Sequence, residues 1–294
     1  MSIIDDIKRS YKQGEVLTKF IYINIGVFVT VRLLQVFFSF SGGPGADYPL
    51  LRWISVPSEP SLLLVKPWTL FTYMFVHYEF IHFIFNILVL YWFGKLFMAF
   101  FTPRQFVGVY LLGGLAGALL YFISYNTIPV LYTHFPSSLL MGASASIMAI
   151  LFAATRYRPE FTVEMMFFGP VKLKYIALIY FLLDLISISA LNNAGGHFAH
   201  IGGAALGWYF AVQLLKGKDI TNGFHKFIDR ITTLFNRKPT LTVSYKRPVS
   251  DMEFNAKKVN RQAELDRILE KIKKSGYDSL TKQEKKTLFE ESKN

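Results

Sequence analysis

Long apolar stretches separated by short polar connections run through residues 20–215 of this chain. A helix needs about 20 apolar residues to cross roughly 30 Å of hydrocarbon, because each residue rises about 1.5 Å. Six stretches approach this length and are predicted to be transmembrane helices: about 20–40, 80–101, 106–125, 141–155, 175–191 and 197–215. The pattern therefore predicts an all-α, polytopic membrane protein with a six-helix bundle.

The ends of the chain differ from this apolar body. Residues 1–19 carry charges of both signs, and no small-residue cleavage site follows the first apolar run, so we expect the first span to be retained as an anchor. From Lys216 onward the chain holds 19 of its 32 lysine and arginine residues. We predict a cytoplasmic N-terminal segment over 1–19, a membrane domain over 20–217, and a basic cytoplasmic tail with short helices over 218–294.

Basic residues in short loops indicate orientation, because positively charged loops tend to stay in the cytoplasm. They gather before the first stretch, between the second and third, and between the fourth and fifth: Lys8, Arg9, Lys12, Lys19, Lys95, Arg104, Arg156, Arg158, Lys172 and Lys174. The connections 126–140 and 192–196 contain no lysine or arginine. We therefore expect a multi-pass protein of a bacterial cytoplasmic membrane, with both termini in the cytoplasm.

Composition supports a membrane protein. Hydrophobic residues make up 52% of the chain, 29 residues are Phe, and the mean hydropathy is +0.32 despite a net charge of +12. A soluble globular domain does not have this profile. Cysteine is absent, which excludes disulfides, thiol nucleophiles and cysteine-rich metal sites.

Two apolar stretches carry residues suited to nucleophilic catalysis. Ser144 lies in Gly-Ala-Ser-Ala-Ser at 142–146, and its distance from Arg156 corresponds to a rise of about 18 Å. His200 lies about 24 Å before Lys216 by the same rise, so both side chains are placed in the outer half of the membrane. A serine and a histidine at one depth suggest a nucleophile with its base. For the pentapeptide alone, small-residue helix packing is the simpler interpretation.

Further residues could stabilise a negative oxygen. A helix that begins at Ser144 presents unpaired N–H groups and a positive dipole end. His82 and Asn86 are four residues apart, hence on one helical face, and both can donate hydrogen bonds to a tetrahedral intermediate. Gly142 leaves space where a substrate carbonyl would approach, and we group it with them as oxyanion-stabilising. Taken alone, the His82–Asn86 pair is more simply a clamp between helices.

Several motifs in order resemble the rhomboid family of intramembrane serine proteases over about 67–207: Pro67-Trp68, residues 72–77, the His82-to-Asn86 spacing, residues 142–145, and residues 199–203 with Gly207. The resemblance implies a six-helix rhomboid-type bundle with Ser144 as nucleophile and His200 as general base. His82, Asn86 and the Ser144 N–H would form the oxyanion hole. It also implies a dyad without a carboxylate, and an in-plane helical hairpin within 41–79. Thr69 stands where many relatives carry an arginine, and Met148 stands where some carry a tyrosine.

The implied activity is that of a serine-type endopeptidase that cleaves transmembrane proteins near the outer membrane face. Neither a metal nor a cofactor is expected, since a zinc-protease motif and a phosphate loop are absent. The alternative is a noncatalytic rhomboid-like protein that binds transmembrane clients. A metal or ion transporter that uses the histidines and Asp184 is a third hypothesis, although the paired carboxylates and repeat-related broken helices expected of one are missing.

Asp184 is the unusual residue of the fifth stretch. A carboxyl group bonded to a neighbouring helix is the simpler explanation, with a proton path or ion site as the alternative. Gly203 and Gly207 form a small-residue pair that would let the fourth and sixth stretches approach closely.

In the tail, apolar residues at helical spacing predict a helix over about 263–272, which Gly276 ends. Thr281 and Glu284 have capping-box spacing and predict a second short helix. The basic stretch up to about 259 could bind anionic headgroups or be a solvated tail. The expected partners are transmembrane protein substrates and the lipid bilayer, and nucleic-acid binding is not expected because a recognition fold is absent. The sequence leaves the oligomeric state open.

Overall fold

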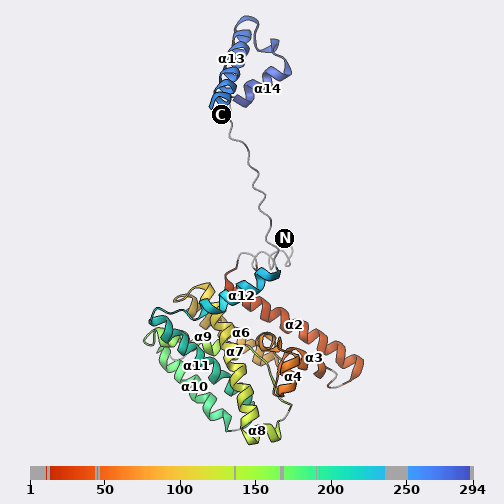
Figure 1. The fold of residues 1–294 in the computed structure, drawn as a ribbon, viewed down its shortest axis with the longest axis vertical. Coiled ribbons are helices and arrows are strands. Elements are labelled where there is room, and N and C mark those ends of the chain that lie inside the picture. Colours follow the sequence, from red (N-terminus) through yellow and green to blue (C-terminus); the bar gives the residue numbers. More distant parts are fainter. Residues whose placement is uncertain are drawn as a thin grey trace. The chain divides into compact units, whose positions relative to one another are not determined.

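The computed structural model describes residues 11, 14–43, 45, 47–135, 137–165, 169–189, 191, 193–235 and 251–291 (Figure 1). Of the predicted N-terminal segment, residues 1–10 lie outside the described residues, as do residues 236–250 of the predicted basic stretch. The chain divides into two compact units, 1–236 and 237–294. Each unit is described by itself.

The first unit is mostly helical. Its helices are α2 (Val16–Gly42), α3 (Tyr48–Ile54), α4 (Pro60–Val65), α5 (Thr69–Thr72), the 3-10 helix η1 (Tyr73–Phe75), α6 (Phe80–Met98), α7 (Pro103–Thr127), α8 (Pro129–His134), α9 (Ser144–Tyr157), α10 (Leu173–Ile188), α11 (Ala194–Leu215) and α12 (Thr221–Phe235). Each of the six predicted stretches is a helix. Among the described residues, α2, α6, α7 and α11 are long and apolar enough to cross a membrane. The six-span count stays a prediction, because α9 has 14 residues and α10 has 16.

Short strands accompany these helices, which the all-α prediction did not include. Val56–Pro57 (β1) pairs with Leu139–Leu140 (β2), and Thr162–Met165 (β3) forms a hairpin with Gly169–Lys172 (β4). A two-residue strand is too short to show an alternating pattern, so the sequence could not predict β1 and β2. Residues 41–79 contain α3, α4, α5 and η1, a more broken arrangement than the hairpin that the resemblance implied.

Glycines let α9 pack directly against the backbones of α7 and α11, as the prediction for Gly203 and Gly207 required. A Cβ placed on Gly203 would overlap the carbonyl oxygen of Ala145, and one on Gly207 would overlap that of Ala149. On the other side, a Cβ on Gly117 would lie 2.6 Å from the Cβ of Ala145. The first turns of α9 are therefore held between two glycine-bearing helices: their backbone meets that of α11 directly, and the small side chain of Ala145 meets Gly117 of α7.

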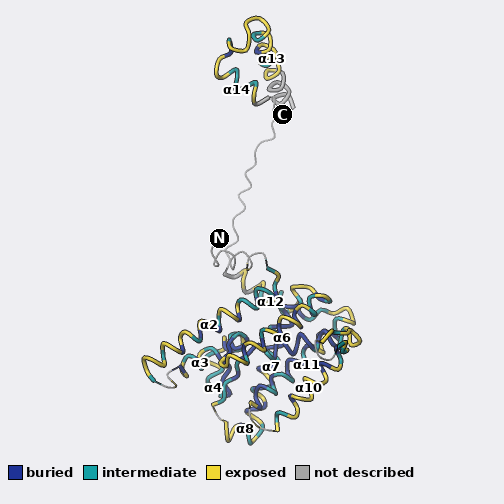
Figure 2. The backbone as a smooth tube through the Cα atoms, turned by 180° about the vertical axis from the view of Figure 1, so that it is seen from behind, coloured by how far each residue is buried: buried dark blue, intermediate teal, exposed yellow. Residues whose placement is uncertain are grey.

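Burial gathers on α7, α9 and α11, whereas α2 and α10 are largely exposed (Figure 2). Most exposed side chains of these two outer helices are apolar, and seven of them are more than half exposed: Leu33, Val36, Phe37, Phe40, Ile179, Leu183 and Ile186. Soluble monomers rarely expose such continuous apolar faces. A hydrocarbon environment explains why the helices carry apolar residues outside as well as inside.

The compact unit continues past the predicted domain boundary at 217, because α12 packs against the start of α7. His225 Nε2 donates to the carbonyl of Arg104 at 2.7 Å, and the Arg104 guanidinium pairs with Asp229 at 2.8 Å. Gln105 also donates to Asp219 at 3.0 Å. Part of the predicted tail is therefore an ordered helix of the first unit.

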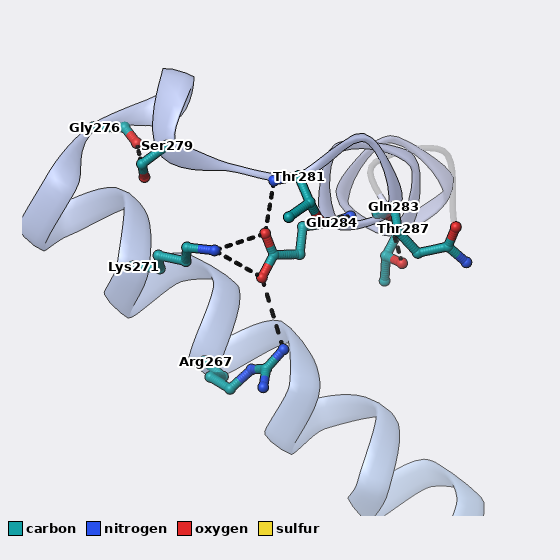
Figure 3. Close-up of polar contacts among 8 residues, drawn as sticks. All are labelled: Arg267, Lys271, Gly276, Ser279, Thr281, Gln283, Glu284 and Thr287. Atoms are coloured by element: carbon teal, nitrogen blue, oxygen red, sulfur yellow. Dashed lines mark hydrogen bonds and ion pairs between the residues drawn. The ribbon is translucent and has the colours of Figure 1, made fainter.

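The second unit consists of α13 (Asp251–Ser275), η2 (Tyr277–Ser279) and α14 (Lys282–Glu291). Gly276 has φ +77° and ends α13, as predicted, although α13 begins well before the predicted start. Thr281 and Glu284 form the predicted capping box, since Thr281 N–H donates to Glu284 at 2.8 Å and Glu284 N–H donates to Thr281 Oγ1 at 3.3 Å. Figure 3 shows Lys271 and Arg267 of α13 reaching the same carboxylate, at 2.9 and 3.7 Å.

The close contact at Gly203 predicts a large effect from one methyl group. Gly203→Ala should lower the free energy of unfolding in detergent by about 1–3 kcal/mol, because alanine favours a helix but here pushes α11 away from the Ala145 carbonyl. Gly26→Ala is the matched control, since a Cβ on Gly26 of α2 meets nothing within 4 Å. Equal stability of the two variants would contradict this packing.

The capping carboxylate predicts an effect on the second unit. Hydrogen bonding from the Thr281 backbone N–H, followed by the contact with Lys271, lowers the pKa of Glu284 to about 2. A carboxylate with a lowered pKa stabilises the fold above its ordinary pKa of about 4.3, and this stabilisation is lost as the pH falls toward 2. In the full-length protein at pH 7, Glu284→Gln should therefore increase proteolysis between α13 and α14 several-fold. Glu264→Gln, at an exposed position of α13, should cleave like the wild type.

Candidate active site

Four of the five predicted site residues line one cavity. Ser144, His200, His82 and Asn86 surround a space of about 290 Å³ between α6, α9, α10 and α11. Most of its remaining lining is apolar: Phe85, Val89, Phe93, Ile147, Met148, Leu151, Tyr180 and Leu183, with Asp184 as the exception. A second hollow of about 650 Å³ shares His82, Ser144 and His200, so these three side chains lie where the two spaces meet.

Ser144 is the first residue of α9, and hydrogen bonds fix the chain that leads to it. Gly142 N–H donates to the Tyr73 carbonyl at 2.9 Å, and Ala143 N–H donates to His77 Nε2 at 3.3 Å. The first bond of the helix runs from Ile147 N–H to the Ala143 carbonyl. Among the described residues, none accepts a hydrogen bond from the Ser144 N–H, so this donor stays available for an anion.

The occupied amides refine the expected role of Gly142. Its N–H already has a partner, so what Gly142 offers the cavity is the missing side chain. Its φ is +123°, and a Cβ there would lie 3.3 Å from His82 Cε1 and 3.7 Å from Ser144 Oγ. A side chain at this position would strain the backbone and reach into the space between the serine and the histidine.

His77 is a supporting residue of this loop. It is fully buried, and burial lowers its pKa to about 4, so the ring is neutral near pH 7 and its Nε2 can accept the Ala143 amide. Because the unfolded chain binds the proton near pH 6.5, the stability that this ring contributes is lost as the pH falls from about 6.5 toward 4. The His77 and His82 ring centroids are 5.8 Å apart.

Asn86 and His82 lie on the cavity face of α6. The Asn86 amide nitrogen donates one hydrogen to the His82 carbonyl at 2.9 Å, which leaves its second hydrogen for another acceptor. Asn86 Oδ1 is buried and has no hydrogen-bond partner among the described residues. A buried polar atom without a partner destabilises a folded protein, and its presence beside this cavity is consistent with a functional role for Asn86.

A carboxylate anchors His200. Asp184 Oδ1 of α10 lies 2.8 Å from Nδ1 of His200 and 2.8 Å from Nδ1 of His197, both on α11. This confirms the simpler prediction for Asp184, a carboxyl bonded to a neighbouring helix. Because Nδ1 is occupied, Nε2 is the ring nitrogen left to act as a base. Among the described residues, no hydrogen bond joins His200 to Ser144 Oγ, and catalytic hydrogen bonds are often long before substrate binds.

The same three residues could in principle hold a cation. Asp184, His197 and His200 place one possible ligand atom each within 4.8 Å of one another. Their direct hydrogen bonds already account for this grouping, so it does not by itself indicate a metal. Met148 is buried and lines the cavity with His200.

Comparison with known proteins agrees with this geometry. A family model described as the Rhomboid domain matches residues 65–217, more than half of the chain. This chain belongs to the rhomboid family. It is also similar to the RHOMBOID-like protein 12, mitochondrial, of Arabidopsis thaliana, with 28% identity over 158 residues. That match covers 51% of the chain and 47% of the relative, so the chain spans about half the length of this curated protein.

Family membership and the apolar helices together make this rhomboid an integral membrane protein. A family of unknown function (DUF6576) matches residues 250–294, which include α13 and α14. The rhomboid match ends at 217, before α12 begins.

Sequence reasoning missed two contributors to the site of this rhomboid. His77 ends the motif at residues 72–77, but its bond to Ala143 depends on a loop 66 residues away. For Asp184 the sequence predicted a bond to a neighbouring helix but not the partner, although two histidines lie 13 and 16 residues further along the chain. In both cases the partner lies on another element, which periodicity does not locate.

The His77 contact predicts a local effect on the loop before Ser144. His77→Phe removes the acceptor of the buried Ala143 amide, which costs about 1–3 kcal/mol. Hydrogen exchange of residues 139–146 in detergent should therefore become faster, and His77→Gln, which can still accept a hydrogen bond, should lie in between. His134→Phe, at an exposed histidine of α8, is the control. Unchanged exchange in His77→Phe would argue against the contact.

Proposed function

We propose that this rhomboid is an intramembrane serine endopeptidase that cleaves transmembrane protein substrates, with Ser144 as nucleophile and His200 as general base. The observation that carries the proposal is the gathering of Ser144, His200, His82 and Asn86 around one cavity, although they come from three helices. A packing patch would not need two histidines, an amide and a serine to face the same space. The proposal requires no metal or cofactor.

The cavity also suits a peptide that arrives from the bilayer. Phe85 and Leu183 line the cavity and are more than half exposed, so the cavity opens to the side of the helix bundle between α6 and α10. The second hollow adds Glu79, Ser138 and Asn193 at the same histidines and serine, which offers a more polar side to the site. A substrate helix could thus unwind from lipid into a polar space, and small or helix-destabilising residues near its outer end would favour this.

The reaction would proceed in two proton-balanced halves. Ser144 Oγ attacks the scissile carbonyl carbon, its proton passes to His200 Nε2, and the carbonyl π electrons move onto the oxygen. The Ser144 N–H, His82 and Asn86 would donate to that oxyanion. The intermediate then expels the amine, which takes the proton from His200. Water then attacks the acyl-enzyme: His200 takes a proton from the water and gives it to Ser144 Oγ as the ester bond breaks.

Orientation and location belong to the same proposal. Both termini would lie in the cytoplasm of a bacterial cell, with six spans and a cytoplasmic tail, and the basic loops support this orientation. Ser144 would then lie roughly 10 Å below the outer surface, because the 14 residues of α9 rise only about 21 Å. Cleavage would occur near the outer face of the membrane.

The alternative function is binding of transmembrane clients without cleavage. The hydrogen-bonded base and the free N–H of Ser144 favour catalysis, because a client-binding protein has no need of either. A measurement of substrate cleavage distinguishes catalysis from client binding.

The test is cleavage of a fluorogenic single-span substrate by the purified full-length protein in liposomes. Ser144→Ala and His200→Ala should each lower the turnover number by about 10³-fold or more, because a nucleophile and its base act as one unit. Ser146→Ala is the matched control: Ser146 is buried two residues further along α9, does not line the cavity, and has no hydrogen-bond partner for its hydroxyl among the described residues.

Two outcomes would count against proteolysis by this pair. Activity that persists in Ser144→Ala would point to another nucleophile or a contaminating protease. Wild-type protein that binds but does not cleave a panel of single-span substrates, including ones with glycine near the outer end, would favour client binding.

A further inference from the structure

The contact between Asp184 and His200 is not needed by a two-residue mechanism. The carboxylate lies on α10 and the histidine on α11, yet Oδ1 and Nδ1 are 2.8 Å apart, the distance of a charge-assisted hydrogen bond. The Asp184 side chain is only 9% exposed and that of His200 20%. Both residues line the cavity that contains Ser144.

This contact determines which tautomer of His200 is stable. A neutral imidazole carries one N–H and one lone pair, and an ionised carboxylate can only accept. The proton of His200 must therefore lie on Nδ1, which leaves the lone pair on Nε2. This is the tautomer that can take a proton from Ser144 Oγ.

We infer that Asp184 is a positioning residue that holds His200 in its base-competent tautomer, so that Ser144, His200 and Asp184 work as a triad rather than a dyad. The inference rests on the proposed proteolysis. When His200 accepts the serine proton at Nε2, it becomes an imidazolium with both ring nitrogens protonated. Its Nδ1–H stays bonded to Asp184, which remains ionised, and the Nε2 proton then goes to the leaving amine.

His197 also bonds to the Asp184 carboxylate, but it is not the catalytic base. Its Nδ1 also lies 2.8 Å from Asp184 Oδ1, three residues before His200 on the same helix. It does not line the cavity with Ser144. Loss of His197 removes one of the two hydrogen bonds to this oxygen and leaves the bond to His200 in place.

The experiment compares Asp184→Asn with the wild type in full-length protein in liposomes. Asparagine keeps the shape but can donate its amide N–H to Nδ1, which moves the histidine proton to Nε2. The turnover number should fall by about 10²–10⁴-fold with KM unchanged within about 3-fold, as expected for a group needed only in the transition state. His197→Gln should keep the turnover number within about 5-fold of the wild type, since the His200 contact survives.

A second measurement reads the tautomer without any activity. Histidine-ring ¹⁵N spectra of the six histidines, with His200 assigned by His200→Gln, should show the proton on Nδ1 in the wild type and on Nε2 in Asp184→Asn. A wild-type His200 protonated on Nε2 would overturn the inference, even if Asp184→Asn did not fold. A turnover number within about 3-fold of the wild type in folded Asp184→Asn would also overturn it.

The remaining outcomes separate this inference from its alternatives. If His197→Gln loses as much activity as Asp184→Asn, the three residues act as a structural cluster and the positioning role is refuted. Loss of wild-type activity on adding EDTA would mean that the cluster holds a metal, and would refute it too. If wild-type protein cleaves no substrate, proteolysis itself fails, and the spectra still show whether Asp184 sets the tautomer.

Discussion

The structure depends on the close contact that α9 makes with two glycine-bearing neighbouring helices. In hydrocarbon, helices gain little from burying apolar side chains against one another, so association relies on close packing. Gly203 and Gly207 let the backbone of α11 meet the carbonyl groups of Ala145 and Ala149, and Gly117 of α7 leaves room for the Ala145 methyl group. The helix that carries Ser144 is thus held close to the helix that carries His200. Site geometry follows from this contact.

The short length of α9 has a second consequence. In the proposed six-span arrangement, a helix of 14 residues leaves part of the membrane depth to irregular chain, which is tolerated only where its polar groups are satisfied within the protein. Here the Gly142 N–H donates to the Tyr73 carbonyl, and the Ala143 N–H donates to His77 Nε2. Because those two amides are occupied, the amide of Ser144 is the first free donor at the helix start among the described residues. The loop that satisfies its own backbone groups therefore also leaves the Ser144 N–H available to an oxyanion.

Buried polar groups are costly in such an environment, and this structure groups them. Asp184 and its two histidine partners form one hydrogen-bonded set, and the amide of Asn86 lies beside the same cavity. A carboxylate isolated in an apolar helix would be strongly disfavoured, whereas two N–H donors at 2.8 Å compensate for its burial. The chemistry of the cavity is thus supported by bonds that also stabilise the bundle.

The sequence by itself predicted the six helices, four residues that line the cavity, the glycine pair of α11 and the capping box at Thr281, because these follow from spacing along single elements and from the motifs of the rhomboid resemblance. It did not determine β1 with β2, the packing of α12 on α7, or the partner of Asp184. Those contacts join elements far apart in the chain, and their distances depend on how helices of fixed shape pack. Periodicity reveals which face of a helix carries the polar or small residues. Only the tertiary structure decides which residue meets that face, since packing brings the two together.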